Sequence, residues 1–176
     1  MMREYGSPVC GGSSMVFTKE IVEAAEYVKN NKDSVLGGHI VSPIQLDSEY
    51  GGFWFYGQHL VQMVTAVFGT DVKSVKAERN GATVLVTYYY DNYAVTAFGG
   101  SGFGVNVYKT TGVCSAESIS LPEDFYMPEL MEFYDMTKTG KGASDMSEFL
   151  APVFIIDATV KAYEQGKEIK IEIPEF

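Results

Sequence analysis

The dipeptide Asn80-Gly81 is the feature of this sequence that most constrains its fold. Asn-Gly between alternating apolar residues is the strongest short-range signal for a β-hairpin, because both residues tolerate the positive φ angles that a two-residue turn requires. Pairing across this turn sets Ala77 opposite Val84 and Val75 opposite Val86. The chain on either side of the dipeptide is therefore predicted to form an antiparallel hairpin.

A second turn, at Asp91-Asn92, tests this interpretation. Pairing across it sets Tyr88 opposite Val95 and Val86 opposite Ala97. The two turns independently place the same residues on one face of the sheet, and these are Val75, Ala77, Val84, Val86, Tyr88, Val95 and Ala97. A slip of one residue would turn all of these side chains to the other face, so the agreement predicts a β-meander with one buried face.

The other face of the meander is more apolar than a surface open to water usually is. It carries Leu85, Thr87, Tyr89, Thr96 and Phe98. A contiguous apolar surface of this kind is typical of an interface between protein chains. We therefore expect a homodimer that forms through the open face of the sheet.

Helices and further strands flank the meander. Apolar residues at helical spacing predict helices over 18–32, 57–68, 128–136 and 149–163, and extended segments are predicted at 8–10, 34–46, 102–109, 113–121 and 169–173. Pro152 is expected to confine the last helix to the residues after it, or to kink it. At 176 residues the chain is predicted to be an α+β two-layer sandwich, with an open, predominantly antiparallel sheet and helices on one face.

Composition excludes several classes of function. The net charge is -10 and the 13 Lys and Arg residues are scattered, so we expect no nucleic-acid partner. No apolar run is long enough to span a membrane, and we expect a cytoplasmic protein. Cys10 and Cys114 are expected to be reduced thiols, with a disulfide as the minor alternative. No metal motif is present, and the glycines of 99–104 fit a flexible hairpin loop rather than a dinucleotide-binding motif.

The stretch GGFWFYGQH, which ends at His59, contains the strongest candidate for chemistry. A helix that begins at Gly57 would place His59 in its first turn, where the helix dipole favours the neutral imidazole. Histidine can then exchange a proton near neutral pH. The alternative is a hydrogen-bonded core histidine, with the preceding aromatic residues serving as core or interface anchors.

Three segments together resemble the Gfo/Idh/MocA oxidoreductases, a family named for glucose–fructose oxidoreductase and inositol dehydrogenase. PVCGGSSMVFTKEI, residues 8–21, is similar to the segment in which that family crosses from its nucleotide-binding domain into a helix. GGFWFYGQHLVQMVTAVFG, residues 51–69, is similar to its glycine-rich loop, its site histidine and the helix that follows. The end of the chain, which contains AYEQGKEIKI, is similar to the family's last helix and strand.

The resemblance implies a C-terminal domain. Residues 1–17 would be the crossover from a nucleotide-binding domain that this chain does not contain, and 18–176 would be a single substrate-binding and dimerisation domain. NAD or NADP would bind only through the other domain, so the chain alone is expected to bind no cofactor and to be inactive. His59 would be the catalytic acid and base, and Trp54 and Tyr56 would face a sugar or polyol substrate.

Two positions depart from the family's pattern. Phe55 stands where an aspartate usually precedes the histidine by four residues, and Val16 stands where the crossover segment carries an arginine. These departures keep a second interpretation open, in which the chain is a non-catalytic dimeric scaffold or a small-ligand-sensing domain derived from the same fold.

Overall fold

The computed structural model describes residues 7–142 and 145–174, and within them one mixed sheet organises the molecule. Its seven strands lie in the order β6-β5-β1-β4-β3-β2-β7. They are β1 (Val35–Pro43), β2 (Ser74–Asn80), β3 (Thr83–Tyr89), β4 (Ala94–Gly100), β5 (Gly104–Lys109), β6 (Gly112–Ala116) and β7 (Ile169–Lys170). The α-helices are α2 (Lys19–Asn30), α3 (Phe53–Phe68), α4 (Met127–Thr139) and α5 (Met146–Gln165), and the 3-10 helices are η1 (Ser14–Phe17) and η2 (Lys32–Ser34).

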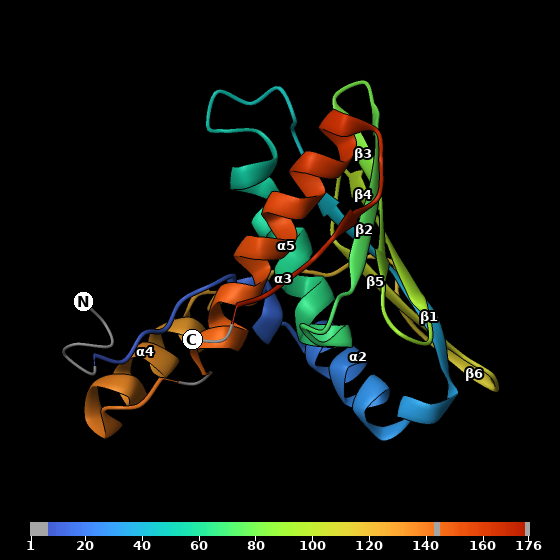
Figure 1. Ribbon diagram of the computed structural model, residues 1–176. Helices are drawn as coiled ribbons and strands as arrows, with labels where there is room; N and C mark the ends of the chain where they lie inside the picture. The colour runs from blue at the N-terminus through green and yellow to red at the C-terminus, as the bar shows by residue number, and fades with distance from the viewer. Residues whose placement is uncertain (1–6, 143–144, 175–176) are drawn as a thin grey trace.

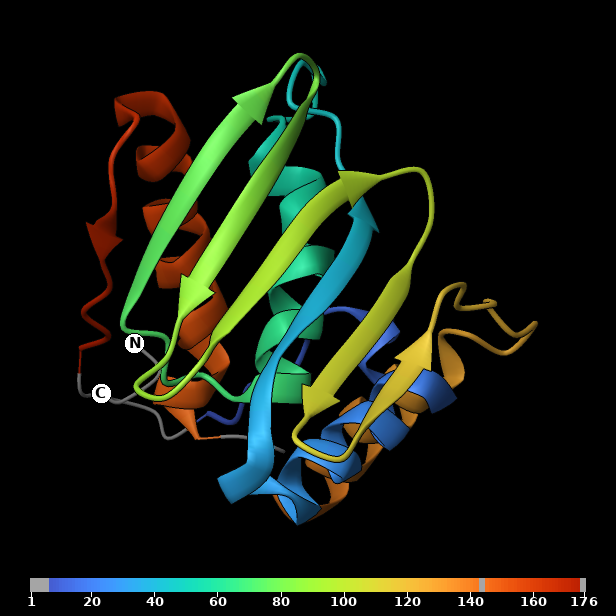
Figure 2. The same ribbon diagram turned by 90° about the vertical axis from the view of Figure 1, so that its right-hand side faces the viewer.

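Helices cover only one face of the sheet. Helices α2, α3 and α5 pack against it in Figure 1, and Figure 2 looks onto the opposite face, which no helix or strand of the described residues covers. Helix α4 stands apart from the sheet and has no buried residue. The predicted α+β sandwich with an open sheet is therefore confirmed.

The buried face of the meander is the one that the two turns predict. All seven of the residues assigned to it are at most 3% exposed. They pack against apolar residues of the covering helices, such as Ile21 of α2, Leu60 of α3 and Ile155 of α5. Phe68, the last residue of α3, lies directly over Gly38 of β1, where a Cβ atom would fall 2.1 Å from its ring.

The register of the first hairpin differs from the prediction by two residues. Ala77 pairs with Val86 rather than Val84, because the two-residue turn is Gly81-Ala82 and only Gly81 has a positive φ angle, of 62°. Side chains alternate with a period of two, so this shift leaves every residue on its predicted face. The second hairpin has the predicted register, with Tyr88 opposite Val95.

The connection at 99–104 is not a hairpin loop. Strand β1 lies between β4 and β5, pairing parallel with β4 and antiparallel with β5. The glycines therefore carry the chain across the end of β1. The sequence could not show this, because a strand inserted from 60 residues earlier leaves no local signal.

Three other predictions about elements are corrected. Residues 8–10 form no strand, and the last strand is only Ile169–Lys170. Helix α5 continues on both sides of Pro152 instead of starting after it, with Asp145 capping its first turn. The buried stripe of α5 includes Ala151, Ala158 and Ala162, whose small side chains let the helix lie close to the sheet. Val153, which was expected on this stripe, is 49% exposed.

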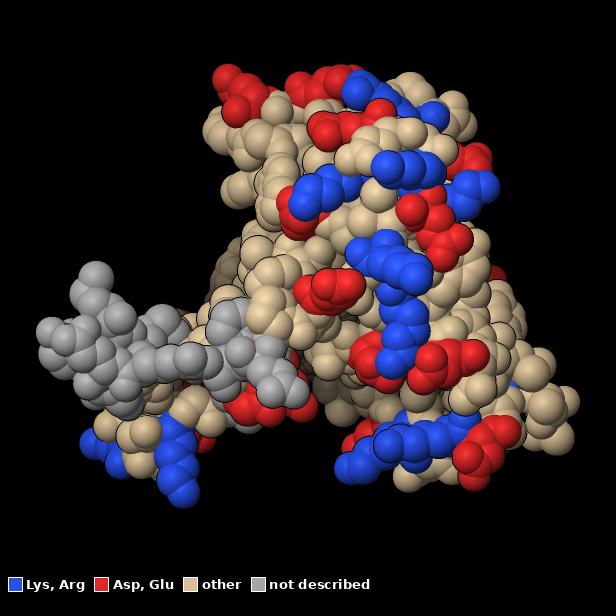
Figure 3. All heavy atoms as spheres, viewed as in Figure 1, with Lys and Arg blue, Asp and Glu red and all other residues tan. Residues whose placement is uncertain are grey.

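Charged side chains are mixed on the surface. Figure 3 shows Lys and Arg interspersed with Asp and Glu on the side of the molecule that carries α5 and β7, without a basic stripe. Among the described residues, no helix has the length and apolar character needed to cross a membrane.

Candidate functional site

Helix α3 begins earlier than the sequence suggested. Gly52 precedes it with a φ angle of 59°, and a Cβ atom there would lie 2.5 Å from the carbonyl oxygen of Leu46, so only glycine fits. The helix starts at Phe53, and the aromatic residues form its first turn instead of a loop. His59 consequently lies in the second turn, away from the free N–H groups at the helix start.

Ser13 is the hydrogen-bond partner of His59. Its Oγ lies 2.7 Å from His59 Nδ1 and also accepts the backbone N–H of Met15 at 3.2 Å. Ser13 is only 2% exposed, so its hydroxyl is fixed by η1 rather than by solvent. This contact joins α3 to the segment that resembles the family's crossover.

Two glutamates of α4 complete the surroundings. Glu129 accepts a hydrogen bond from the Ser14 hydroxyl. Burial lowers the pKa of His59, and the negative charge of Glu129 partly opposes that shift, so the imidazole is neutral at neutral pH. Burial and the neighbouring Glu129 both raise the pKa of Glu132. The neutral imidazole is the form of histidine that can accept a proton in general base catalysis.

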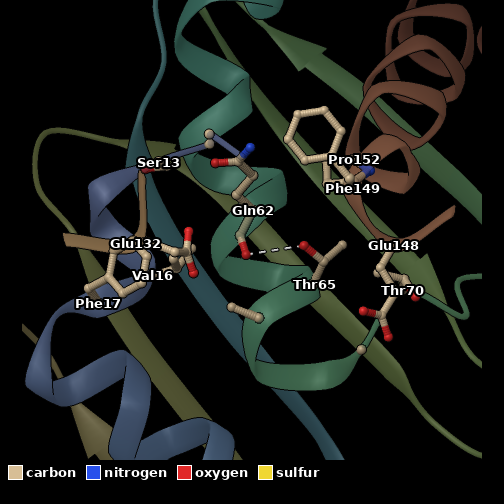
Figure 4. A pocket seen from close by; sticks show the side chains of 14 residues that line it. Ser13, Val16, Phe17, Gln62, Thr65, Thr70, Glu132, Glu148, Phe149 and Pro152 are labelled. Atoms are coloured by element: carbon tan, nitrogen blue, oxygen red, sulfur yellow. Dashed lines mark hydrogen bonds between the residues drawn. The ribbon is translucent and has the colours of Figure 1, made fainter. Parts of the chain in front are cut away.

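A cavity of about 390 Å³ lies beside this group, and Figure 4 shows its walls. Its lining includes Ser13, Gln62 and Thr65 from the η1 and α3 side, Glu132 from α4, and Glu148 and Phe149 from α5. The buried Gln62 Oε1 has no hydrogen-bond partner in the described part of the chain. No Lys or Arg of the described residues lines the cavity, so these walls suit a neutral ligand with hydroxyl donors rather than an anion.

The other two predicted site residues lie elsewhere on α3. Trp54 is 46% exposed, and five positions separate it from His59, so the two side chains leave the helix about 140° apart. The Tyr56 ring packs edge-on against Phe55, with ring centroids 4.9 Å apart. Neither residue lines the cavity, and His59 does not line it either. The structure thus brings His59 to Ser13, which is part of the cavity wall, and it brings neither Trp54 nor Tyr56 into the cavity.

Sequence reasoning missed Ser13, Glu129 and the cavity. The paired serines at 13 and 14 were a usable signal, because they lie in the segment that resembles the family's crossover. The sequence of α4 contains no signal for the position of Glu129, because the contact between α4 and η1 joins parts of the chain that are far apart in sequence.

The described part of the chain contains neither a disulfide between the two cysteines nor a cluster of side chains that could bind a metal ion. Cys10 and Cys114 are free thiols, and burial raises the pKa of each. Within residues 7–142 and 145–174, no group of three or more His, Cys, Asp or Glu side chains could hold a metal ion.

Comparison with known proteins identifies the fold. No protein-family model and no curated protein matches the chain. A probable dehydrogenase from Thermotoga maritima superimposes with a TM-score of 0.77 at 17% identity, over 96% of this chain and 66% of that one. Scyllo-inositol dehydrogenase from Lactobacillus casei, solved with NAD(H) and scyllo-inositol, gives 0.72 at 14%, over 96% and 66%. Myo-inositol 2-dehydrogenase from Lactobacillus plantarum gives 0.73 at 13%, over 90% and 63%.

These likenesses define the fold of the chain, an α+β domain that also occurs in dehydrogenases of known structure. The chain has the fold found in part of each of these structures, which confirms the resemblance to the C-terminal domain of Gfo/Idh/MocA oxidoreductases at the level of fold. It spans about two thirds of the length of the solved chains it matches.

Proposed function

We propose that this chain is the substrate-binding and dimerisation domain of a cytoplasmic, Gfo/Idh/MocA-like NAD(P)-dependent oxidoreductase that acts on a sugar or polyol. The observation that carries the proposal is the contact between His59 and buried Ser13, beside a polar cavity, in a fold shared with inositol dehydrogenases. A nucleotide-binding domain would account for the remaining third of such an enzyme, and residues 1–17 would lead out of it.

In this proposal His59 exchanges a proton with the substrate. Oxidation of an alcohol releases a hydride, which the nicotinamide accepts, and a hydroxyl proton, which needs a base. Ser13 Oγ has two lone pairs, and can accept His59 Nδ1–H as well as the N–H of Met15. That arrangement holds the tautomer whose Nε2 is free to take the proton. Trp54 and Tyr56 would contact substrate or the second domain at the rim.

The test is His59→Ala in a two-domain enzyme that contains this chain. Loss of a general base is expected to lower kcat by roughly 10²-fold or more. Added imidazole should restore part of the rate, which a purely structural loss would not allow. Urea unfolding of the variant serves as the folding control. Unchanged kcat in a folded His59→Ala enzyme would end the catalytic assignment.

A second candidate is a non-catalytic dimeric scaffold or small-ligand sensor. Phe55, in the place of the usual acid, is 45% exposed and packs against the rings of Tyr50 and Tyr56, and its phenyl side chain can supply no acid or base. The two candidates separate by calorimetry. An oxidoreductase domain should bind polyol tightly only beside its nucleotide-binding domain and NAD, whereas a sensor should bind its ligand as the single chain.

A further inference from the structure

A row of polar side chains crosses the open face of the sheet. Direct cross-strand pairs join Thr87 to Thr96, Thr96 to His39, and His39 to Asn106. The row continues to Ser115 at one edge, and to Lys76 toward the other. His39 Nδ1 lies 2.8 Å from Thr96 Oγ1, and Ser115 donates to Asn106, so the row is internally hydrogen-bonded.

Apolar rows flank this polar row on both sides. One contains Leu85, Phe98 and Val41, and the other contains Tyr89, Ala94, Tyr108 and Val113. Leu85, Phe98, Tyr108 and Val113 are 37–54% exposed. The five adjacent strands β6, β5, β1, β4 and β3 lie wholly within the described residues and place no Asp, Glu, Lys or Arg on this face. An uncharged face on a chain of net charge -10 suits a second copy, because two such faces can approach without the repulsion that two acidic surfaces would meet.

The pattern is also self-complementary. In a face-to-face dimer the two-fold axis lies in the interface plane. The axis can run parallel to the strands, or perpendicular to them along the polar row. In either case the polar row of one copy lies over the polar row of the other, and apolar rows lie over apolar rows. We propose that the row through His39 and Thr96 sets the register of a face-to-face homodimer, and that protonation of His39 weakens this dimer. The proposal rests on the dimerisation part of the proposed function and adds its register and its pH control.

The surroundings of His39 determine the sign of the effect. Its neighbours on β4 and β5 are Thr96 and Asn106, and neither can balance a positive charge. Among the described residues, the titratable groups on the same face are Tyr108 on β5, Tyr89 on β3, Lys76 and Glu78 on β2, which pair with each other at 3.2 Å, and Lys170 on β7, opposite Ser74. Glu168 accepts a hydrogen bond from Ser74 at that edge of the sheet. In the described part of the chain no carboxylate is a cross-strand neighbour of the imidazole, and a second copy brings only the same groups.

Burial already lowers the pKa of His39 in the single chain, and a covering copy would lower it further. Proton uptake is then weaker in the dimer than in the monomer. By linkage, the dimer is unaffected at neutral pH and weakens as the pH falls through the pKa of His39 in the monomer, which lies below the ordinary histidine value of about 6.5. The overall charge has the opposite effect on the dimer. The acidic chain loses net negative charge as the pH falls toward its pI of about 4.6, and this reduces the repulsion between the two copies.

The first experiment measures the dimer dissociation constant of the 176-residue chain by sedimentation equilibrium. Wild type is expected to dimerise about tenfold or more weakly at about pH 5.5 than at about pH 7.5. His39→Gln keeps a polar group but cannot be protonated, so its dimer should keep its affinity or tighten. Equal pH dependence in both proteins would overturn the role of His39 while leaving the dimer intact.

The second experiment tests the face. Thr96→Lys places a charge in the centre of the row and is expected to weaken dimerisation by about 100-fold or more, because two buried ammonium groups would meet across the interface. Val22→Lys, at a position 42% exposed on α2, is the matched control and should leave the dissociation constant unchanged. A monomer for wild type at about 100 µM, well above typical specific affinities, would overturn the dimer itself. The oxidoreductase assignment is judged separately by the turnover of His59→Ala.

Discussion

Replacing Gly38 with valine is expected to lower the free energy of unfolding by about 3 kcal/mol or more. A Cβ atom at this position would lie 2.1 Å from Cζ of Phe68 and 2.7 Å from the backbone oxygen of Asn106. The Phe68 ring is buried, so its displacement would disturb the packing between α3 and the sheet, and the backbone oxygen belongs to the neighbouring strand β5. Urea denaturation of the two proteins measures the difference.

Two further variants identify the cause of this loss. Gly102→Ala is the matched control, since a Cβ atom there meets nothing within 4 Å, and it should change stability by less than about 0.5 kcal/mol. Combining Gly38→Val with Phe68→Ala should cost less than the sum of the single changes, because the second removes one of the two collisions. If the losses of unfolding free energy in the two single variants simply added in the double variant, the valine would not be clashing with the Phe68 ring.

Replacing Tyr88 with alanine is expected to destabilise the fold by roughly 3–5 kcal/mol. Tyr88 is the largest fully buried side chain of the described residues, and it lies between the sheet and Thr159 of α5. Truncation would leave a cavity that the surrounding valines cannot fill. Thermal and urea unfolding should both detect the loss, with the open face of the sheet unaltered.

The matched control is Tyr88→Phe, which keeps the ring and removes the hydroxyl. That hydroxyl lies 3.4 Å from Thr159 Oγ1, which donates a shorter hydrogen bond of 2.7 Å to the carbonyl of Ile155. Thr159 therefore stays satisfied, and the expected loss is about 1 kcal/mol or less. A large loss in Tyr88→Phe would mean that the buried hydroxyl, and not ring packing, dominates at this position.

The sheet was predictable where local rules decide. Side-chain alternation placed Val75, Val86 and Val95 on the buried face even though one hairpin register was off by two, because an even shift preserves the face. The insertion of β1 between β4 and β5 was not predictable. It depends on pairing between His39 and Thr96, which no nearby turn specifies.

The candidate site was predictable only in part. His59 stood out because it follows an aromatic, glycine-flanked stretch and fits a family pattern. The surroundings of His59 could not be predicted, because Ser13 and Glu129 approach it from distant parts of the chain. The helix start was misplaced because Phe53 to Tyr56 have no strong helix propensity, and Gly52 fixes the boundary through its backbone angle.

The position of β1 has a consequence during synthesis. Thr96, across from His39, is 57 residues further along the chain. At a translation rate of about 5–20 residues per second, β1 waits roughly 3–11 seconds before its first partner emerges from the ribosome. A nascent chain whose β1 strand lacks its sheet partners for that long exposes unpaired backbone and apolar side chains, which favours premature association with other chains.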